Sequence, residues 1–153
     1  MKTFKGRPVI PGEAEAEALV SHNGFNTLAS FQGALQFGDL PVIGNKYKQT
    51  ECDDQNNPEI YRKPMLNKAL CLPQTIGSTT GGMILFCANM LGKCPSCLLF
   101  SNHIDSLAAA GAVLADVWGN GLPTVDCLGD EFLEAVKTGD KIKVYKDGTV
   151  EIY

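Results

Sequence analysis

The segment with the clearest chemical potential is a loop rich in glycine, serine and threonine at residues 73–82, with the sequence PQTIGSTTGG. It lies between apolar runs at 69–72 and 83–88, which predict a buried strand before the loop and a helix after it. Such a loop aims backbone N–H groups and hydroxyls at one point, which suits an anion or an oxyanion. Ser78 follows Gly77 and is expected at the carboxyl end of the strand, where ligands bind in α/β sheets.

Ser78 is therefore the main catalytic candidate, with Gly77, Thr79 and Thr80 as candidate substrate-binding residues beside it. A serine hydroxyl is a weak nucleophile and a weak base, so it needs an adjacent base, a metal, or N–H donors that stabilise its alkoxide. The alternative is structural, because a serine or threonine here could simply cap the helix. The loop lacks the lysine of a Walker A motif and the spacing of a Gly-x-Ser-x-Gly elbow.

His103 is the second candidate for substrate binding. It follows a predicted strand at 98–100 and precedes a predicted helix at 105–118, on the sheet edge where Ser78 is expected. The alternative is that Asp105 caps this helix and that His103 is a solvated loop residue.

A Cys-x-x-Cys pair at Cys94 and Cys97 could hold zinc or exchange thiols. Zinc sites normally need further ligands, and the motif leads into a predicted strand, so a buried strand entry is favoured. The acidic segment at 51–55 offers oxygen atoms without the spacing of a calcium loop, which favours a solvated loop. No metal site is expected on this chain.

The composition restricts the classes of function. The chain has 153 residues and a net charge of −4, with 13 Lys and Arg against 17 Asp and Glu and no basic stripe, which argues against nucleic acid and anionic membranes. Its arginines are Arg7 and Arg62. Because carboxylate and phosphate sites usually employ guanidinium groups, this scarcity suggests that a partner completes the site. Without an apolar leader or a membrane-length run, we expect a cytoplasmic protein whose six cysteines are reduced.

The apolar pattern predicts an α/β fold in a single domain spanning residues 1–153. Strands are expected at 8–10, 16–20, 69–72, 98–100 and 123–126, an extended piece at 28–31, helices at 82–93, 105–118 and 130–137, and a closing hairpin at 141–145 and 149–153. The helix at 82–93 is apolar almost all round, so we expect a second sheet layer or another subunit to cover it. Residues from about 34 to 67 form a long polar excursion, of the kind that serves a site or a partner.

The order of these motifs resembles the small subunit, or swivel domain, of the aconitase X family. The residues that carry the resemblance are Pro73, Gly77-Ser78-Thr79, the Ala-Ala-Gly-Ala-Val run at 109–113, Thr138-Gly139-Asp140, and two opening segments at 11–21 and 30–33. They cover nearly the whole chain apart from the polar excursion. Each motif is short, so the specificity of the resemblance comes from their order.

The resemblance implies a hydro-lyase built from this swivelling three-layer β/β/α piece and a large subunit that carries an iron–sulfur cluster. In the wider superfamily, the serine after glycine in such a loop acts as the base, which corresponds to Ser78. A Ser78 alkoxide held by loop amides would abstract a proton α to a carboxylate, while the cluster iron on the other subunit acts as Lewis acid on the hydroxyl.

The resemblance also suggests a substrate. Thr75 and Ile76 stand where many relatives carry an arginine, which weakens a phosphate-binding interpretation. We therefore expect cis-3-hydroxy-L-proline dehydratase first, forming Δ1-pyrroline-2-carboxylate, and mevalonate 5-phosphate dehydratase as the alternative. A non-catalytic assembly or regulatory module, and a stand-alone serine hydrolase that uses His103 as its base, are further hypotheses.

Overall fold

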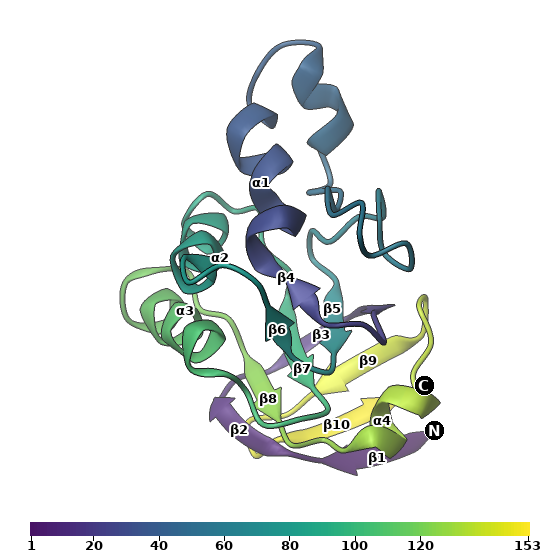
Figure 1. Cartoon of the computed structure of the whole chain (residues 1–153). Helices are drawn as coiled ribbons and strands as arrows, with labels where there is room; N and C mark the ends of the chain where they lie inside the picture. The colour runs from purple at the N-terminus through teal and green to yellow at the C-terminus, as the bar shows by residue number, and fades with distance from the viewer.

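Eight strands form one sheet that curls back towards itself in the computed structural model, which describes residues 1–153 (Figure 1). The strands are β1 (Lys2–Lys5), β2 (Arg7–Ile10), β3 (Ala14–Val20), β5 (Ala69–Leu72), β7 (Cys97–Phe100), β8 (Thr124–Asp126), β9 (Lys141–Val144) and β10 (Thr149–Ile152). Their order in the sheet is β1-β10-β9-β3-β5-β7-β8-β2. Only Gly6 separates β1 from β2, so the first and last strands of this order are joined through one residue.

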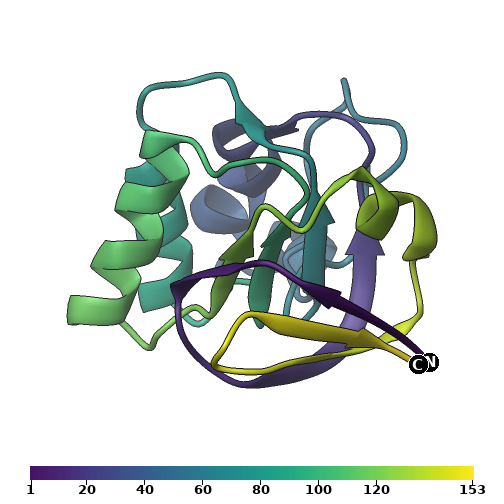
Figure 2. The same ribbon diagram turned by 90° about the horizontal axis from the view of Figure 1, so that it is seen from below.

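One half of the sheet is parallel and the other half is antiparallel. Strands β3, β5, β7 and β8 run parallel to one another, whereas β9, β10 and β1 pair in antiparallel fashion. The carboxyl ends of the parallel strands therefore meet at one edge, and Figure 2 shows the loop before α2 at that edge, with the β9–β10 hairpin at the opposite edge.

Alternating side chains of the parallel strands separate two apolar cores. Leu70 and Phe100 belong to a core beneath the helices, whereas Cys71 and Leu99 belong to a core shared with the antiparallel strands. All four side chains are fully buried. The molecule thus has a helical layer, a parallel sheet layer and an antiparallel sheet layer, as the predicted β/β/α arrangement requires.

Three helices cover the outer face of the parallel strands, and a short fourth helix lies on the other side (Figure 1). They are α1 (Thr27–Phe37), α2 (Gly81–Met90), α3 (Ser106–Trp118) and α4 (Asp130–Ala135). None of the helices has both the length and the apolar character needed to cross a bilayer. A further two-residue strand pair joins β4 (Phe25–Asn26) to β6 (Thr75–Ile76).

Helix α2 packs between α1 and α3 on the sheet. Its buried side includes Leu85 and Ala88, while Met83, Met90 and the following Leu91 are at least half exposed. The prediction that α2 is buried on several sides is confirmed, but α1, α3 and the parallel strands cover it, and the expected cover by the second sheet layer is wrong because that layer packs on the other face of the parallel strands. Its outer face remains apolar and accessible.

The extended piece predicted at 28–31 is wrong, because these residues lie inside α1. The Asn26 side chain accepts a hydrogen bond from Ala29 N–H at 3.0 Å and caps the helix. Phe31 and Ala34, spaced by one helical turn, are both fully buried. Capping and this spacing outweigh the local strand tendency of the sequence.

The polar excursion is more ordered than its composition suggests. Its first residues complete α1, and a 3₁₀ helix, η1, spans Ile43–Tyr47. Beyond η1, Cys52, Ile60 and Met65 are fully buried in the helix-side core, and Asp54 is buried as well. The solvated loop predicted at 51–55 is therefore wrong at these two positions, because widely spaced apolar residues anchor the segment.

Candidate functional site

The loop that carries Ser78 is bent sharply at Gly77, whose φ is +95°. A Cβ atom at this position would lie 2.6 Å from Nδ2 of Asn26, the residue that caps α1. The β4–β6 pairing also places Asn26 opposite Ile76. Glycine is thus required both for the backbone conformation and for the close approach of the two chain segments.

Ser78 is half-buried and lies just outside α2. Its Oγ accepts a hydrogen bond from Thr80 N–H at 3.1 Å and lies 2.7 Å from Thr80 Oγ1. Thr80 occupies the N-cap position of α2, without a capping side-chain bond. Ser78 therefore does not cap the helix in the usual way, and an alkoxide at its Oγ would have two donors from Thr80.

Ser78 lines a hollow of about 180 Å³ where the N-termini of three helices meet. Thr27, Gly81 and Ser106 are the first residues of α1, α2 and α3, and each lines this hollow. Each helix N-terminus carries partial positive charge, which favours a negative group. Asn26 already caps α1, and the Asp105 carboxylate, which lines the hollow, already caps α3. The N-terminus of α2, whose N-cap makes no side-chain hydrogen bond, is the one left open to a ligand. The arrangement suits a substrate carboxylate or the enolate formed from it.

One wall of the hollow is fixed by the N-terminal cap of α3. Asp105 caps α3 by accepting a hydrogen bond from Ala108 N–H at 3.0 Å, as the sequence predicts. The other oxygen of Asp105 accepts a hydrogen bond from the Thr75 hydroxyl. Asp105 thereby ties β6, which leads into the Ser78 loop, to the start of α3.

The structure brings together only some of the predicted site residues. Gly77 and Ser78 line the same hollow, and Thr80 contacts Ser78, whereas Thr79 is exposed on the loop. His103 lines a separate hollow of about 490 Å³. A serine hydrolase with His103 as its base is not supported by this arrangement, because His103 makes its hydrogen bonds to other residues.

The sequence interpretation missed a cluster around Arg7. The guanidinium Nε and Nη2 donate to the two oxygens of Asp126 at 2.9 and 2.6 Å, and Nη2 lies 3.1 Å from Nε2 of His103. The Asp126 side chain is fully buried and also accepts from Ile104 N–H at 2.8 Å. Burial would raise the pKa of Asp126, but the hydrogen bonds from Arg7 and Ile104 outweigh it and keep this pKa below its ordinary value.

The residues of this chain do not fit an iron–sulfur cluster or another metal ion. No three His, Cys, Asp or Glu side chains converge to form a ligand set. The pKa of Cys97 is raised to about 12 by burial, which disfavours the thiolate that a metal needs. Of the Cys-x-x-Cys pair, Cys97 is fully buried at the start of β7 and Cys94 accepts a hydrogen bond from Asn89, so both pack structurally.

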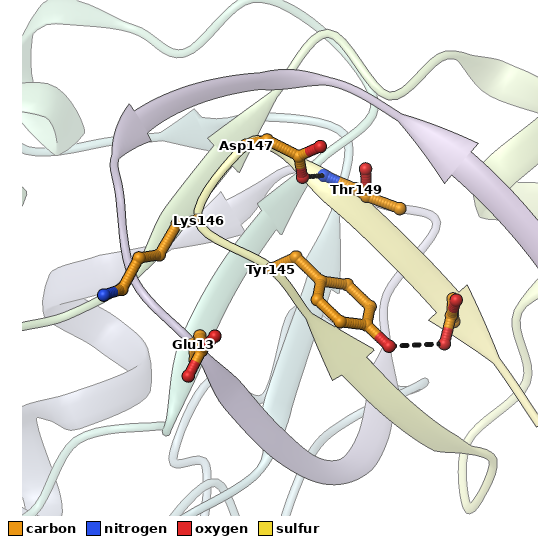
Figure 3. A pocket seen from close by; sticks show the side chains of 6 residues that line it. Glu13, Tyr145, Lys146, Asp147 and Thr149 are labelled. Carbon is orange, nitrogen blue, oxygen red and sulfur yellow. Dashed lines mark hydrogen bonds between the residues drawn. The ribbon is translucent and has the colours of Figure 1, made fainter.

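A third hollow, also of about 490 Å³, lies at the β9–β10 hairpin (Figure 3). Three of the polar groups around it already have partners. Tyr145 donates to Glu151, and Asp147 accepts from Thr149 N–H and pairs with Lys5, which lowers the pKa of Asp147 to about 2. It lies at the sheet edge opposite the Ser78 loop and contributes nothing to that site (Figure 2).

Comparison with known proteins identifies relatives along nearly the whole chain. The chain is 28% identical over 149 residues to the phosphomevalonate dehydratase small subunit of Aeropyrum pernix, covering 97% of this chain and 92% of that protein. It superposes on the crystal structure of Thermococcus kodakaraensis aconitase X in its holo-form with a TM-score of 0.77 and 26% identity, covering 100% and 99% of the two chains.

A more distant relative is the cis-3-hydroxy-L-proline dehydratase of Pseudomonas aeruginosa, which is 27% identical over 128 residues, 84% of this chain and 19% of that protein. These relatives are dehydratases or their subunits, so the predicted hydro-lyase class is confirmed. The aconitase X swivel domain model matches residues 3–152, and the predicted fold class is confirmed with it. This chain belongs to the aconitase X swivel domain family.

Proposed function

We propose that this chain is the small subunit of a mevalonate 5-phosphate dehydratase, with Ser78 as the base. Similarity to phosphomevalonate dehydratase small subunits along 97% of the chain supports this assignment. The order of substrates expected from the sequence is therefore reversed. Hydroxyproline becomes the second candidate, because its named relative matches over fewer residues.

The observation that carries the proposal is the convergence of three helix N-termini on the hollow beside Ser78. Mevalonate 5-phosphate is a 3-hydroxy acid, so the proton on C2 lies α to its carboxylate. In the proposed step, the Ser78 alkoxide takes this proton and the C–H electron pair forms the C2–C3 double bond. The hydroxyl leaves C3 with the C–O electron pair as hydroxide, which a Lewis acid on the partner subunit would accept. The N-terminus of α2, which has no side-chain cap, stabilises the negative charge that develops on the carboxylate.

Thr80 contributes to the basicity of Ser78 in this proposal. Its backbone N–H and its hydroxyl both lie within hydrogen-bonding distance of Ser78 Oγ. Both groups stabilise the alkoxide relative to the neutral hydroxyl, and a preorganised donor of this kind contributes on the order of a hundredfold in rate. Thr80 is thus a positioning and stabilising residue for the base.

The hollow beside Ser78 requires a partner to become an active site. It is small, its one charged lining residue is Asp105, and no lysine or arginine lines it. A large subunit would cover the hollow, exclude water and supply cationic groups for the substrate carboxylate. We also place the family's iron–sulfur cluster on that subunit, because this chain brings together no ligand set, and we assign only the proton abstraction to this chain.

The test is reconstitution with the large subunit encoded by the same organism. We expect the purified complex to dehydrate mevalonate 5-phosphate faster than cis-3-hydroxy-L-proline, and Ser78→Ala to abolish turnover while the complex still assembles. Ser96→Ala is the matched control, since Ser96 lies in the turn between Cys94 and Cys97, and it should retain wild-type turnover.

Two outcomes would contradict the proposal. If Ser78→Ala retained turnover, Ser78 could not be the base. That result would favour the hypothesis that the chain is a non-catalytic assembly module, in which the substitution changes only the melting temperature. A preference for hydroxyproline would leave the dehydratase mechanism standing and overturn the substrate.

A further inference from the structure

We propose that Arg7, supported by His103, forms an anion-binding subsite next to the Ser78 hollow and that it takes the terminal phosphate of a short aliphatic phosphate ester. This inference rests on the proposed dehydratase function, which it extends to the end of the substrate far from the reacting carbon. Neither the relatives' names nor the Ser78 loop assigns a role to Arg7.

The first support is the rigidity of Arg7. Two of its nitrogens donate to Asp126 at 2.9 and 2.6 Å, and Asp126 is fully buried and is held in turn by Ile104 N–H at 2.8 Å. Such a two-point contact fixes the plane of the guanidinium. The side chain is therefore oriented before a ligand arrives, which reduces the entropy lost on binding.

The second support is the protonation pattern of His103. Its Nδ1 lies 2.7 Å from the carbonyl oxygen of Ile104, which can only accept, so Nδ1 carries the proton. In this tautomer Nε2 accepts from Arg7 Nη2 at 3.1 Å. His103 therefore acts as a positioning residue for the guanidinium.

The third support is the group that Arg7 leaves free. The hydrogen bonds of the guanidinium use Nε and Nη2, so both N–H groups of Nη1 remain available. The Arg7 side chain is 52% exposed, whereas its counterion is entirely buried. A ligand in the hollow thus meets the cationic side of the pair, with the carboxylate behind it.

The fourth support is the lining of the hollow beside Arg7 and His103, which combines a cationic group with an apolar wall. It measures about 490 Å³, no acidic side chain lines it, and its remaining wall includes Pro8, Val9 and Ala109. This apolar wall suits a short methylene chain, while the guanidinium suits phosphate. The chemical class that fits is an alkyl phosphate rather than a nucleotide.

Ser106 connects the two hollows. This first residue of α3 lines both the Ser78 hollow and the Arg7 hollow. A substrate that spans both hollows would place a carbon that loses its proton, next to one anionic group, in the Ser78 hollow. Its other end would carry a second anionic group in the Arg7 hollow. Mevalonate 5-phosphate has this form, whereas hydroxyproline carries a single carboxylate. The Arg7 subsite would therefore determine specificity between the two candidate substrates.

The test measures binding to the full chain by NMR, with propyl phosphate as the probe and propanol and butyrate as comparisons. We expect propyl phosphate to shift the Arg7 Nε–Hε signal and the amides of His103 and Ile104 in a saturable manner, with butyrate weaker and propanol silent. The double substitution Arg7→Gln with Asp126→Asn should weaken binding by about tenfold or more, since it removes a charge-assisted contact.

The double substitution removes one charge of each sign, so the net charge stays the same and no carboxylate is left buried without a partner. Arg62→Gln, which alters the other arginine, is the matched control and should bind normally. If the double variant melts at a much lower temperature, Ala109→Glu serves instead, because it places a carboxylate in the hollow without touching the ion pair.

Three results would overturn the phosphate subsite. They are NMR shifts that do not saturate with propyl phosphate, shifts centred on the Ser78 loop, and binding of butyrate as strong as that of propyl phosphate. The parallel turnover assay separates this failure from that of the proposed function. If Ser78→Ala abolishes turnover while propyl phosphate fails to bind at Arg7, only the subsite is wrong. If propyl phosphate binds at Arg7 while Ser78→Ala remains active, the subsite stands and the assignment of Ser78 as the base is wrong.

Discussion

Gly82 of α2 and Gly111 of α3 touch through their backbones: a Cβ atom on Gly111 would lie 2.6 Å from the carbonyl oxygen of Gly82. The two helices therefore meet without intervening side chains near the ends that border the Ser78 hollow. This contact sets the spacing of two of the three helix N-termini around the hollow.

Gly111→Ala should separate the two helices. Overpacking a tight backbone contact typically costs about 1 to 3 kcal/mol, and we expect the free energy of unfolding to fall by this amount. Turnover of the complex should fall too, because the helix ends that face the hollow move apart. Val113→Ala, on the exposed side of α3, should change stability by less than about 0.5 kcal/mol. Urea unfolding of both variants checks this, and equal stabilities would contradict it.

Gly77→Ala tests the geometry of the Ser78 loop. Gly77 and Gly92 both have positive φ, +95° and +69°, so alanine at either position should cost about 1 to 2 kcal/mol in backbone strain. Only Gly77 approaches another group, Asn26, whereas nothing lies within 4 Å of a Cβ on Gly92. We therefore expect Gly77→Ala to lose most of its turnover and Gly92→Ala to keep it. Steady-state assays of the two complexes give the comparison, and similar losses would exclude a special role for the bend.

The contact between His22 and Glu59, which ties the polar excursion to the rest of the fold, should stabilise the protein more at acidic pH than at basic pH. His22 Nδ1 lies 2.7 Å from Glu59, and Nε2 lies 3.1 Å from the carbonyl of Leu133, so only the doubly protonated ring satisfies both acceptors. The hydrogen bond to Glu59 raises the pKa of His22 above its ordinary value of 6.5. The resulting stabilisation is fully present below that value and is lost as the pH rises through the raised pKa.

Glu59→Gln should therefore lower the melting temperature relative to the parent chain at pH 5.5, and the difference should shrink as the pH is raised to 9. His22→Asn should show the same trend. A difference that stays constant over this range would mean that the pair is not ionised as the structure indicates.

The Arg7–Asp126 pair gives a stability prediction independent of any ligand. Removing Arg7 leaves a fully buried carboxylate without its counterion, so Arg7→Ala should lower the free energy of unfolding. The Arg7→Gln, Asp126→Asn double variant should recover a large part of this loss, because neither charge remains. A double-mutant cycle by denaturant titration measures the coupling, and strictly additive losses would contradict it.

Local signals account for the parts of the fold that the sequence predicts. The Asp105 cap marks the start of α3, and Asp147-Gly148 marks the closing hairpin. The Ser78 loop is also found this way, because a strand, a glycine bend and a helix follow one another directly along the chain.

Long-range relationships account for what the sequence does not reveal. The side chains of Arg7 and Asp126 are 119 positions apart, and no local pattern indicates that they meet. The burial of Cys52 and Ile60 depends on a core supplied by distant strands and helices. The separation of His103 from the Ser78 hollow likewise follows from where β2 packs, which is not encoded near His103.

The joining of β1 and β2 through Gly6 has a consequence for how the protein folds. These strands pair with β10 and β8, which lie far from them in the sequence. Sheet closure therefore depends on contacts between distant segments, and contacts of this sequence separation form slowly. Arg7 reaches Asp126 only when β2 pairs with β8, so a chain that lacks β8 would not hold the guanidinium in this position.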